Sequence, residues 1–355
     1  MTTTLIAQRA FTSADQEAFA ALSGDRNPMH MDEAVARQTQ AGARAVHGIH
    51  TALWMLDRYT ATGGNARPIC RIKVNFARFI AVGQDVTVHL ISATPSSTKT
   101  EARVIEARVD DQAVVVMTLG FDAGAGAGAP GAEVAGDLRP VPDRPLDLEF
   151  GAMGDVAGRL ELSPGADPSG LFPALCGTIG AAAVGSLSLL STVVGMIVPG
   201  LHSIFSGLSL TFRGEPVGPA TVTFRPKHAD DRFRLVTMHV SGAGFAGEIS
   251  AFMRFPPVQP PTMERVATLV PPDQFKDRVA LVVGGSRGLG AAVAKLVAAG
   301  GGEVVITYAD NLAAAEAVAA DINAHRKREV CRAVHYDART PDLTGLGELG
   351  HFTHA

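Results

Sequence analysis

Two short stretches of the chain alternate between apolar and polar residues in the same way. Residues 72–76 read Ile-Lys-Val-Asn-Phe, and residues 208–212 read Leu-Ser-Leu-Thr-Phe. Alternation with a period of two is typical of a strand that has one buried face. Each stretch is followed by a Val-Gly turn and another strand, and each is preceded by an apolar helix. The pattern therefore predicts two copies of one unit in which a sheet wraps around a helix.

The central helices are expected from His47 to Tyr59 in the first copy and from Cys176 to about Met196 in the second. The second helix lies in an uncharged run, residues 177–199, that is long enough to span a bilayer. We expect it to be buried by the sheet instead, because glycines and serines dilute its apolar content and an all-apolar helix can form a protein core. Further strands are expected at residues 86–90, 100–110, 113–121, 220–224, 232–240 and 246–255.

A different order of elements begins near residue 274. Residues 279–283 form an apolar run of buried-strand length, followed by the loop Gly284-Gly-Ser-Arg-Gly-Leu-Gly290 and an alanine-rich helix to about residue 299. A strand at 303–308, a helix at 311–325 and a strand at 330–336 are expected next. A glycine loop at the first strand-to-helix turn of such a series suits a pyrophosphate, because its N–H groups and the helix N-terminus attract anions.

These patterns divide the chain into five segments. We expect wrapped units at residues 1–122 and 146–256, and a nucleotide-binding unit at 274–355. Between them lie a flexible linker rich in Gly, Ala and Pro at 123–145 and an extended proline-rich linker at 257–273.

Composition narrows the class of protein. The 355 residues carry a net charge of −4 with mixed signs, so the basic stripe of a nucleic-acid-binding protein is missing. The three cysteines are far apart and have no zinc spacing, and the N-terminus does not read as a signal peptide. We therefore expect a cytoplasmic protein without a metal site, a nucleic-acid partner or a membrane span.

The residues with the clearest chemistry lie at Asp25-Arg-Asn-Pro-Met-His30, with His47-Gly48 following at the start of the first apolar helix. Pro28 stiffens this loop, so that Asp25 and His30 can point into one cleft as a general acid and base. The Gly48 N–H, in the first helical turn, can stabilise an oxyanion. Taken singly, Asp25 reads as a helix cap and His30 as a surface histidine.

The order D-x-N-P-x-H followed by H-G resembles the MaoC-like (R)-specific enoyl-CoA hydratases of the hotdog family, with Ile49 where that family has Met. The resemblance implies an α+β double hotdog that reversibly hydrates trans-2-enoyl thioesters to (R)-3-hydroxyacyl thioesters of coenzyme A or acyl carrier protein, without a cofactor. It implies that Asp25, His30 and the Gly48 N–H are catalytic and that Asn27 and His47 bind substrate.

The second copy has no such motif between residues 163 and 178. We therefore expect it to be structural, with one active site per double hotdog and the usual pairing of two hotdogs made within the chain; the chain could still form a homodimer. A reorganised second site at Asp167 and His202 is the alternative. Other possible functions are a hotdog thioesterase and a non-catalytic scaffold that binds acyl thioesters or nucleotides.

The glycine loop resembles that of the short-chain dehydrogenase/reductase family, T-G-x-x-x-G-x-G, with Val283 in place of the Thr. The resemblance implies a partial α/β Rossmann unit that binds NADP or NAD through Gly284, Ser286, Arg287, Gly288, Leu289 and Gly290, with Asp337 near the adenine. Arg287 favours NADP, although Asp310 follows the second strand closely.

The catalytic Ser and the Tyr-x-x-x-Lys of that family would lie beyond residue 355. We therefore expect about a third of a reductase domain, in a fragment of a longer polypeptide, with no hydride transfer and an unfinished sheet edge. A nucleotide-fold module used for interaction is the alternative. A complete reductase would act on the same β-carbon as the hydratase.

Overall fold

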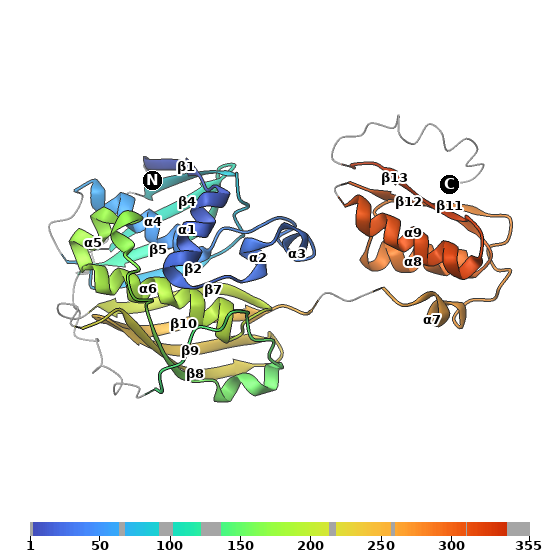
Figure 1. Cartoon of the computed structure of the whole chain (residues 1–355). Helices are drawn as coiled ribbons and strands as arrows, with labels where there is room; N and C mark the ends of the chain where they lie inside the picture. The colour runs from blue at the N-terminus through green and yellow to red at the C-terminus, as the bar shows by residue number, and fades with distance from the viewer. Residues whose placement is uncertain are drawn as a thin grey trace. The chain divides into compact units, whose positions relative to one another are not determined.

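The structure, a computed structural model of the chain, describes residues 3–63, 68–91, 102–121, 136–212, 218–256, 260–309 and 311–338. The chain divides into two compact units, Met1–Pro256 and Pro257–Ala355. The described part of the first unit contains a ten-stranded antiparallel sheet, and that of the second contains a three-stranded parallel sheet (Figure 1). Each unit is described by itself.

The two alternating stretches lie side by side at the centre of the large sheet. Strand β2 (Arg71–Phe76) pairs antiparallel with β7 (Ser203–Phe212), which places Val74 opposite Leu208. Val74 and Leu208 are buried, whereas the intervening Lys73 and Ser209 are exposed, as the alternation predicted. The order β1-β3-β4-β5-β2-β7-β10-β9-β8-β6 joins two halves of matching topology at this pair (Figure 1).

The remaining strands of the large sheet agree with the predicted positions, apart from β1 and β6, which no pattern had indicated. They are β1 (Thr3–Ala10), β3 (Asp85–Ile91), β4 (Ala102–Val109), β5 (Gln112–Gly120), β6 (Gly158–Glu161), β8 (Thr221–Asp230), β9 (Leu235–Gly242) and β10 (Phe245–Met253).

Each half of the sheet wraps around one central helix. Helix α4 (Gly48–Ala61) is buried throughout residues 49–57, and α6 (Ala181–Thr192) is buried from residue 183 to its end. A π-helical turn, η3 (Val193–Ile197), extends α6 and is equally buried. Apolar side chains of both helices and of the inner sheet face form one continuous core. This arrangement is the predicted double hotdog.

The second central helix differs from the continuous helix expected from Cys176 to Met196. It consists of α5 (Pro173–Ile179) and α6, which meet at Gly180, where φ is +85°. Glycine adopts that conformation without steric cost, so the chain turns sharply there. Among the described residues no single helix is long and apolar enough to cross a bilayer. Only α5 and the α6–η3 segment taken together, bent by 115°, have that length and composition.

Shorter helices in the first unit connect these elements. They are α1 (Ser13–Ser23), α2 (Pro28–Met31), α3 (Glu33–Arg37) and the 3₁₀ turns η1 (Phe150–Asp155) and η2 (Pro168–Gly170). In the stretch predicted as a flexible linker, residues 122–135 lie outside the described residues. Beyond them, Leu138 forms a bridge to Arg159 of β6, so the end of this stretch is ordered against the sheet.

The second unit follows the predicted strand-helix order. Strands β11 (Val279–Val282), β12 (Glu303–Tyr308) and β13 (Cys331–His335) are parallel in that order and alternate with α8 (Gly288–Ala299) and α9 (Leu312–Arg326). This is the predicted partial Rossmann unit. The stretch expected to be an extended linker contains α7 (Met263–Ala267), whose Met263 and Val266 are buried in the core of this unit. Apolar burial has outweighed the local preference of the prolines for extended chain.

Candidate active site

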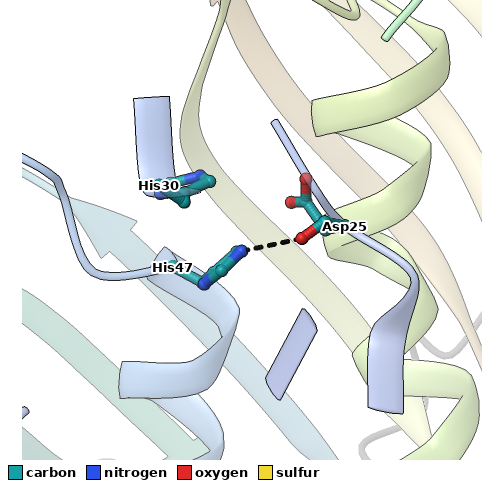
Figure 2. Close-up of side chains that lie close together, drawn as sticks. All are labelled: Asp25, His30 and His47. Carbon is teal, nitrogen blue, oxygen red and sulfur yellow. Dashed lines mark hydrogen bonds between the residues drawn. The ribbon is translucent and has the colours of Figure 1, made fainter. Parts of the chain in front are cut away.

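The loop that carries Asp25 and His30 is shaped by its own residues. Helix α1 ends at Gly24 in the left-handed conformation, and Asp25 follows. The Oδ1 of Asn27 accepts a hydrogen bond from the N–H of Met29 at 3.0 Å, which caps α2, and Pro28 occupies the first turn of that helix. His30 therefore lies on a short helix that faces Asp25 (Figure 2). Both residues are buried, which rules out the surface-histidine interpretation.

The contacts of His30 define its tautomer. Its Nδ1 lies 2.8 Å from the carbonyl oxygen of Ala45. A carbonyl oxygen can only accept, so Nδ1 carries the proton, and in the neutral ring Nε2 holds the lone pair. His30 lines the large cavity described below. The ring is thus arranged to take a proton through Nε2.

The carboxylate of Asp25 receives hydrogen bonds from both halves of the double hotdog. Its Oδ1 accepts the N–H of Asn27 at 3.1 Å, and its Oδ2 accepts the hydroxyl of Ser191, on α6, at 2.6 Å. Burial raises the pKa of Asp25 above its ordinary value, while the charge of His30 and these two hydrogen bonds act to lower it. Such a carboxyl group exchanges a proton more readily near neutral pH than an exposed aspartate.

His47 lies beside this pair and supports it. Its Nε2–H donates to the carbonyl oxygen of Asp25 at 3.1 Å, and its ring stacks on that of His30 with centroids 4.0 Å apart (Figure 2). Burial, together with the charges of His30 and His50, holds the pKa of His47 well below its usual range. His47 is therefore a neutral donor that fixes the loop.

A cavity of about 530 Å³ opens onto Asp25, His30 and Gly48. Residues of the second half form much of its wall, including Ser191 and Gly195. Gly48 is the first residue of α4, where backbone N–H groups have no partner within the helix. A side chain at this position would lie 3.2 Å from the ring of Phe76, so glycine keeps the helix N-terminus open to the cavity.

Asn27 and His47, the expected substrate-binding residues, do not line this cavity; both are buried behind it. The amide nitrogen of Asn27 donates to the carbonyl oxygens of Gly195 at 2.8 Å and Gly200 at 3.1 Å. Asn27 therefore ties the motif loop to the second half. The geometry suits Asn27 and His47 to positioning the motif loop better than to contacting a substrate.

The motif search missed Ser191 and Gly195. A Cβ atom on Gly195 would lie 2.7 Å from Cγ of Asp25, so only glycine leaves room for that carboxylate. The sole signal in the sequence was the run of small residues between 177 and 195. Asp167 and His202 do not line the cavity: Asp167 is exposed and caps η2, and His202 lies 3.4 Å from Asp147.

Asp25, His30 and His47 could each offer one ligand atom to a metal ion, and these atoms lie within 4.8 Å of one another. Two imidazoles and a carboxylate are a suitable donor set for zinc. The hydration chemistry considered below makes no use of a metal.

The glycine loop of the second unit has the backbone expected of a phosphate-binding turn. Gly284 and Gly288 have φ of +79° and +54°, and a Cβ atom on Gly290 would lie 3.0 Å from the carbonyl carbon of Gly284. Thr307 of β12 holds the loop, because its hydroxyl oxygen accepts the N–H of Gly284 at 3.0 Å and its carbonyl oxygen accepts that of Gly285 at 3.0 Å.

The predicted nucleotide-binding residues gather at one edge of the parallel sheet. Gly284, Arg287, Gly288 and Leu289 are exposed, and Ser286 and Gly290 are half-buried. Asp337 follows β13 and is half-buried. The carboxyl ends of parallel strands meet at the same edge, so Asp337 and the loop after β11 lie at the edge where nucleotides bind in open sheets. The residues present therefore fit a dinucleotide.

Comparison with known proteins gives two family matches. Residues 2–114 match the family described as the MaoC like domain, and residues 278–344 match the family described as short chain dehydrogenase. A 3-hydroxybutyryl-CoA dehydratase of Methylorubrum extorquens is 43% identical over 49 residues, which are 14% of this chain and 31% of that protein. The chain thus matches less than a third of the length of this curated relative.

Solved structures with related folds were also found. A MaoC-like dehydratase is 13% identical, with a TM-score of 0.48, over 72% of this chain and 98% of that chain. An (R)-hydratase from A. caviae involved in PHA biosynthesis is 24% identical, with a TM-score of 0.29, over 33% of this chain and 91% of that chain.

Proposed function

Because the chain carries a MaoC-like dehydratase domain over residues 2–114, we propose that it reversibly hydrates trans-2-enoyl thioesters to (R)-3-hydroxyacyl thioesters. The observation that carries the proposal is that Asp25 and His30 line one cavity, together with Gly48 in the first turn of α4. The substrate is an acyl thioester of coenzyme A or of acyl carrier protein. The curated relative is a dehydratase of a 3-hydroxyacyl-CoA, which agrees with this substrate class.

The chemistry needs a base, an acid and an oxyanion site. A water molecule between Nε2 of His30 and the carboxylate of Asp25 loses a proton to one of them while its oxygen bonds to Cβ. The π electrons of the C=C bond move to the thioester carbonyl, whose negative charge the Gly48 N–H stabilises at the helix N-terminus. The enolate then collapses as Cα takes a proton from the protonated partner, so that one water is added overall.

The second half has a supporting role in this proposal. Ser191 holds the carboxylate of Asp25, and the carbonyl oxygens of Gly195 and Gly200 hold Asn27. One active site per double hotdog follows, because the described residues of the second half place no acid-base pair of their own at the cavity.

The test is the loss of enoyl-thioester absorbance on adding the protein to trans-2-butenoyl-CoA, with the configuration of the product determined. Asp25→Asn and His30→Ala should each lower kcat by roughly 10²- to 10⁴-fold, because each removes a proton-transfer group. Asp167→Asn is the matched control, since this exposed carboxylate does not line the cavity.

Three outcomes would contradict the proposal. If both Asp25→Asn and His30→Ala kept the hydratase activity, Asp25 and His30 would not be the proton-transfer groups. Release of free thiol from saturated acyl-CoA would indicate a thioesterase, and binding without turnover on either carrier would indicate a scaffold.

The second unit extends the proposal. Residues 278–344 match the short chain dehydrogenase family, and we infer that the loop 284–290 binds the pyrophosphate of NADP or NAD. Arg287, within this loop, suits the 2′-phosphate of NADP. A reductase of this kind would convert a 3-oxoacyl thioester to the 3-hydroxyacyl thioester that the hydratase site dehydrates.

A further inference from the structure

A second, small cavity lies under the central helices. Its volume is about 20 Å³, and the side chains that line it are all apolar. They come from α4, α6 and the three strands β5, β2 and β7 at the centre of the sheet. The same five elements also contribute residues to the wall of the large cavity.

Residues spaced four apart along α6 and η3 line first the large cavity and then the small one. Gly195 and Ser191 line the large cavity, and Leu187 lines the small one. Residues four apart lie near one face of a helix, about 6 Å from each other along its axis. Leu187 is therefore the next residue inward after Ser191, which holds Asp25.

The sheet follows the same progression. Phe76 and Val115, opposite each other on β2 and β5, line the large cavity. Val74 and Met117, the next opposite pair on this face, line the small cavity. Alternate residues of a strand share one face and are separated by about 6.6 Å. The small cavity thus lies one row deeper on the same inner face.

Helix α4 lines the two cavities in the same order. Gly48 and Thr51 line the large cavity, and Ala52 and Leu56, on the following turns, line the small one. At the other end, the large cavity is bordered by the exposed residues Arg78 and Phe252. A thioester that enters past Arg78 and reaches the Gly48 N–H therefore has its acyl tail directed toward the small cavity.

We propose that the small cavity is the closed end of an acyl channel, so that the site selects short acyl groups; this inference rests on the proposed function. A cavity of 20 Å³ holds about one water-sized group. Longer acyl groups would have to displace Leu187, Val74 or Leu208, which are buried in the core. Leu187 is the residue that sets the limit on the α6 side.

The test measures dissociation constants for S-acyl-pantetheines with butanoyl, hexanoyl, octanoyl and decanoyl groups. These saturated thioesters share the arm common to both carriers and cannot be hydrated, so binding is measured without turnover. In the wild-type protein the affinity should fall by about tenfold or more between hexanoyl and decanoyl, because each methylene that does not fit costs binding. Leu187→Ala should bind octanoyl about tenfold more tightly than wild type and change butanoyl binding much less.

The matched control is Leu189→Ala, on the same helix. Leu189 is also almost fully buried and lines neither cavity, so this variant reproduces the loss of packing without opening the channel. A second variant, Ala52→Leu, fills the small cavity from α4 and should weaken hexanoyl binding while butanoyl binding is kept.

An unchanged chain-length profile in both Leu187→Ala and Ala52→Leu would overturn the inference. So would a wild-type affinity that keeps rising up to the decanoyl group, or the absence of any binding of acyl-pantetheines. If the protein hydrates butenoyl-CoA but the variants do not shift the chain-length profile, the proposed function is supported and the acyl channel is contradicted. If the profile shifts but no hydration occurs, the acyl channel is supported and the proposed function is contradicted.

Discussion

The hydroxyl of Ser191 donates a hydrogen bond to Oδ2 of Asp25 at 2.6 Å, although 166 positions separate the two residues in sequence. Asp25 belongs to the half that carries the motif, and Ser191 belongs to α6 of the half that lacks it. The second hotdog therefore contributes to the site by hydrogen bonding to the carboxylate of Asp25.

Ser191→Ala should shift the pH dependence of hydration. The Ser191 hydrogen bond lowers the pKa of Asp25, so its loss raises that pKa further. If the ionised carboxylate activates water, the acidic limb of the kcat/KM profile moves to higher pH, and kcat/KM at neutral pH falls by about 10- to 100-fold. Ser188→Ala is the control, because the hydroxyl of this buried serine donates to the carbonyl oxygen of Val184 in the same helix. A profile unchanged by Ser191→Ala would mean that the hydroxyl is only structural.

Gly195→Ala should abolish most of the activity. The added methyl group would lie too close to the Asp25 carboxylate, which must then move, and a displacement of about 1 Å can cost about 10²-fold in rate. Gly177→Ala is matched to it, since a Cβ there meets nothing within 4 Å. Measuring kcat and the thermal unfolding temperature of each variant separates a loss of catalysis from a loss of stability. Equal activity in Gly195→Ala and Gly177→Ala would argue against a close contact between residue 195 and the Asp25 carboxylate.

His50 should make the first unit sensitive to acid. Its ring is stacked on Phe19 at 4.7 Å, and burial lowers the pKa of His50 from 6.5 to about 3, with Arg9 acting in the same direction and Asp15 against it. The unfolded chain therefore binds more protons than the folded chain between these values, and stability is lost as pH falls below 6.5 toward about 3.

In His50→Phe, which keeps a ring against Phe19, this loss should shrink. Urea unfolding at about pH 8 and about pH 5 should show roughly 2 kcal/mol less acid destabilisation than in the wild type. The lowered pKa of His47 acts in the same direction and leaves part of the effect in place. The same loss in both proteins would show that His50 is not the source.

Thr307→Val should weaken nucleotide binding by the second unit. Valine keeps the shape of the side chain and the carbonyl that bonds Gly285, but it removes the acceptor for the N–H of Gly284. We expect the dissociation constant for NADPH, measured by fluorescence titration, to rise by about 5- to 10-fold. Thr307→Ser keeps the hydroxyl and should retain wild-type affinity; equal weakening in both variants would indicate a packing effect instead.

Some features could be predicted because they depend on residues that are close in sequence. Alternation identified β2 and β7, and the glycine loop with its flanking strand and helix identified the Rossmann unit. The spacing from Asp25 to His30 predicted two side chains directed into one cavity, because Pro28 and the Asn27 cap act within one turn of chain. Short helices were harder to predict: helix α7 follows from the packing of Met263 and Val266, which no local pattern records.

The sequence by itself thus determined the fold class of both units and the approach of Asp25 and His30 to one cavity, since periodicity and turn chemistry are local properties. Only the tertiary structure decided what completes the site. Pairing of β2 with β7 closes the two halves on each other and places Ser191 and Gly195 against Asp25. That contact depends on burial and hydrogen bonding between segments far apart in the chain, and a serine or glycine in an apolar helix has no local feature that distinguishes it from ordinary core packing.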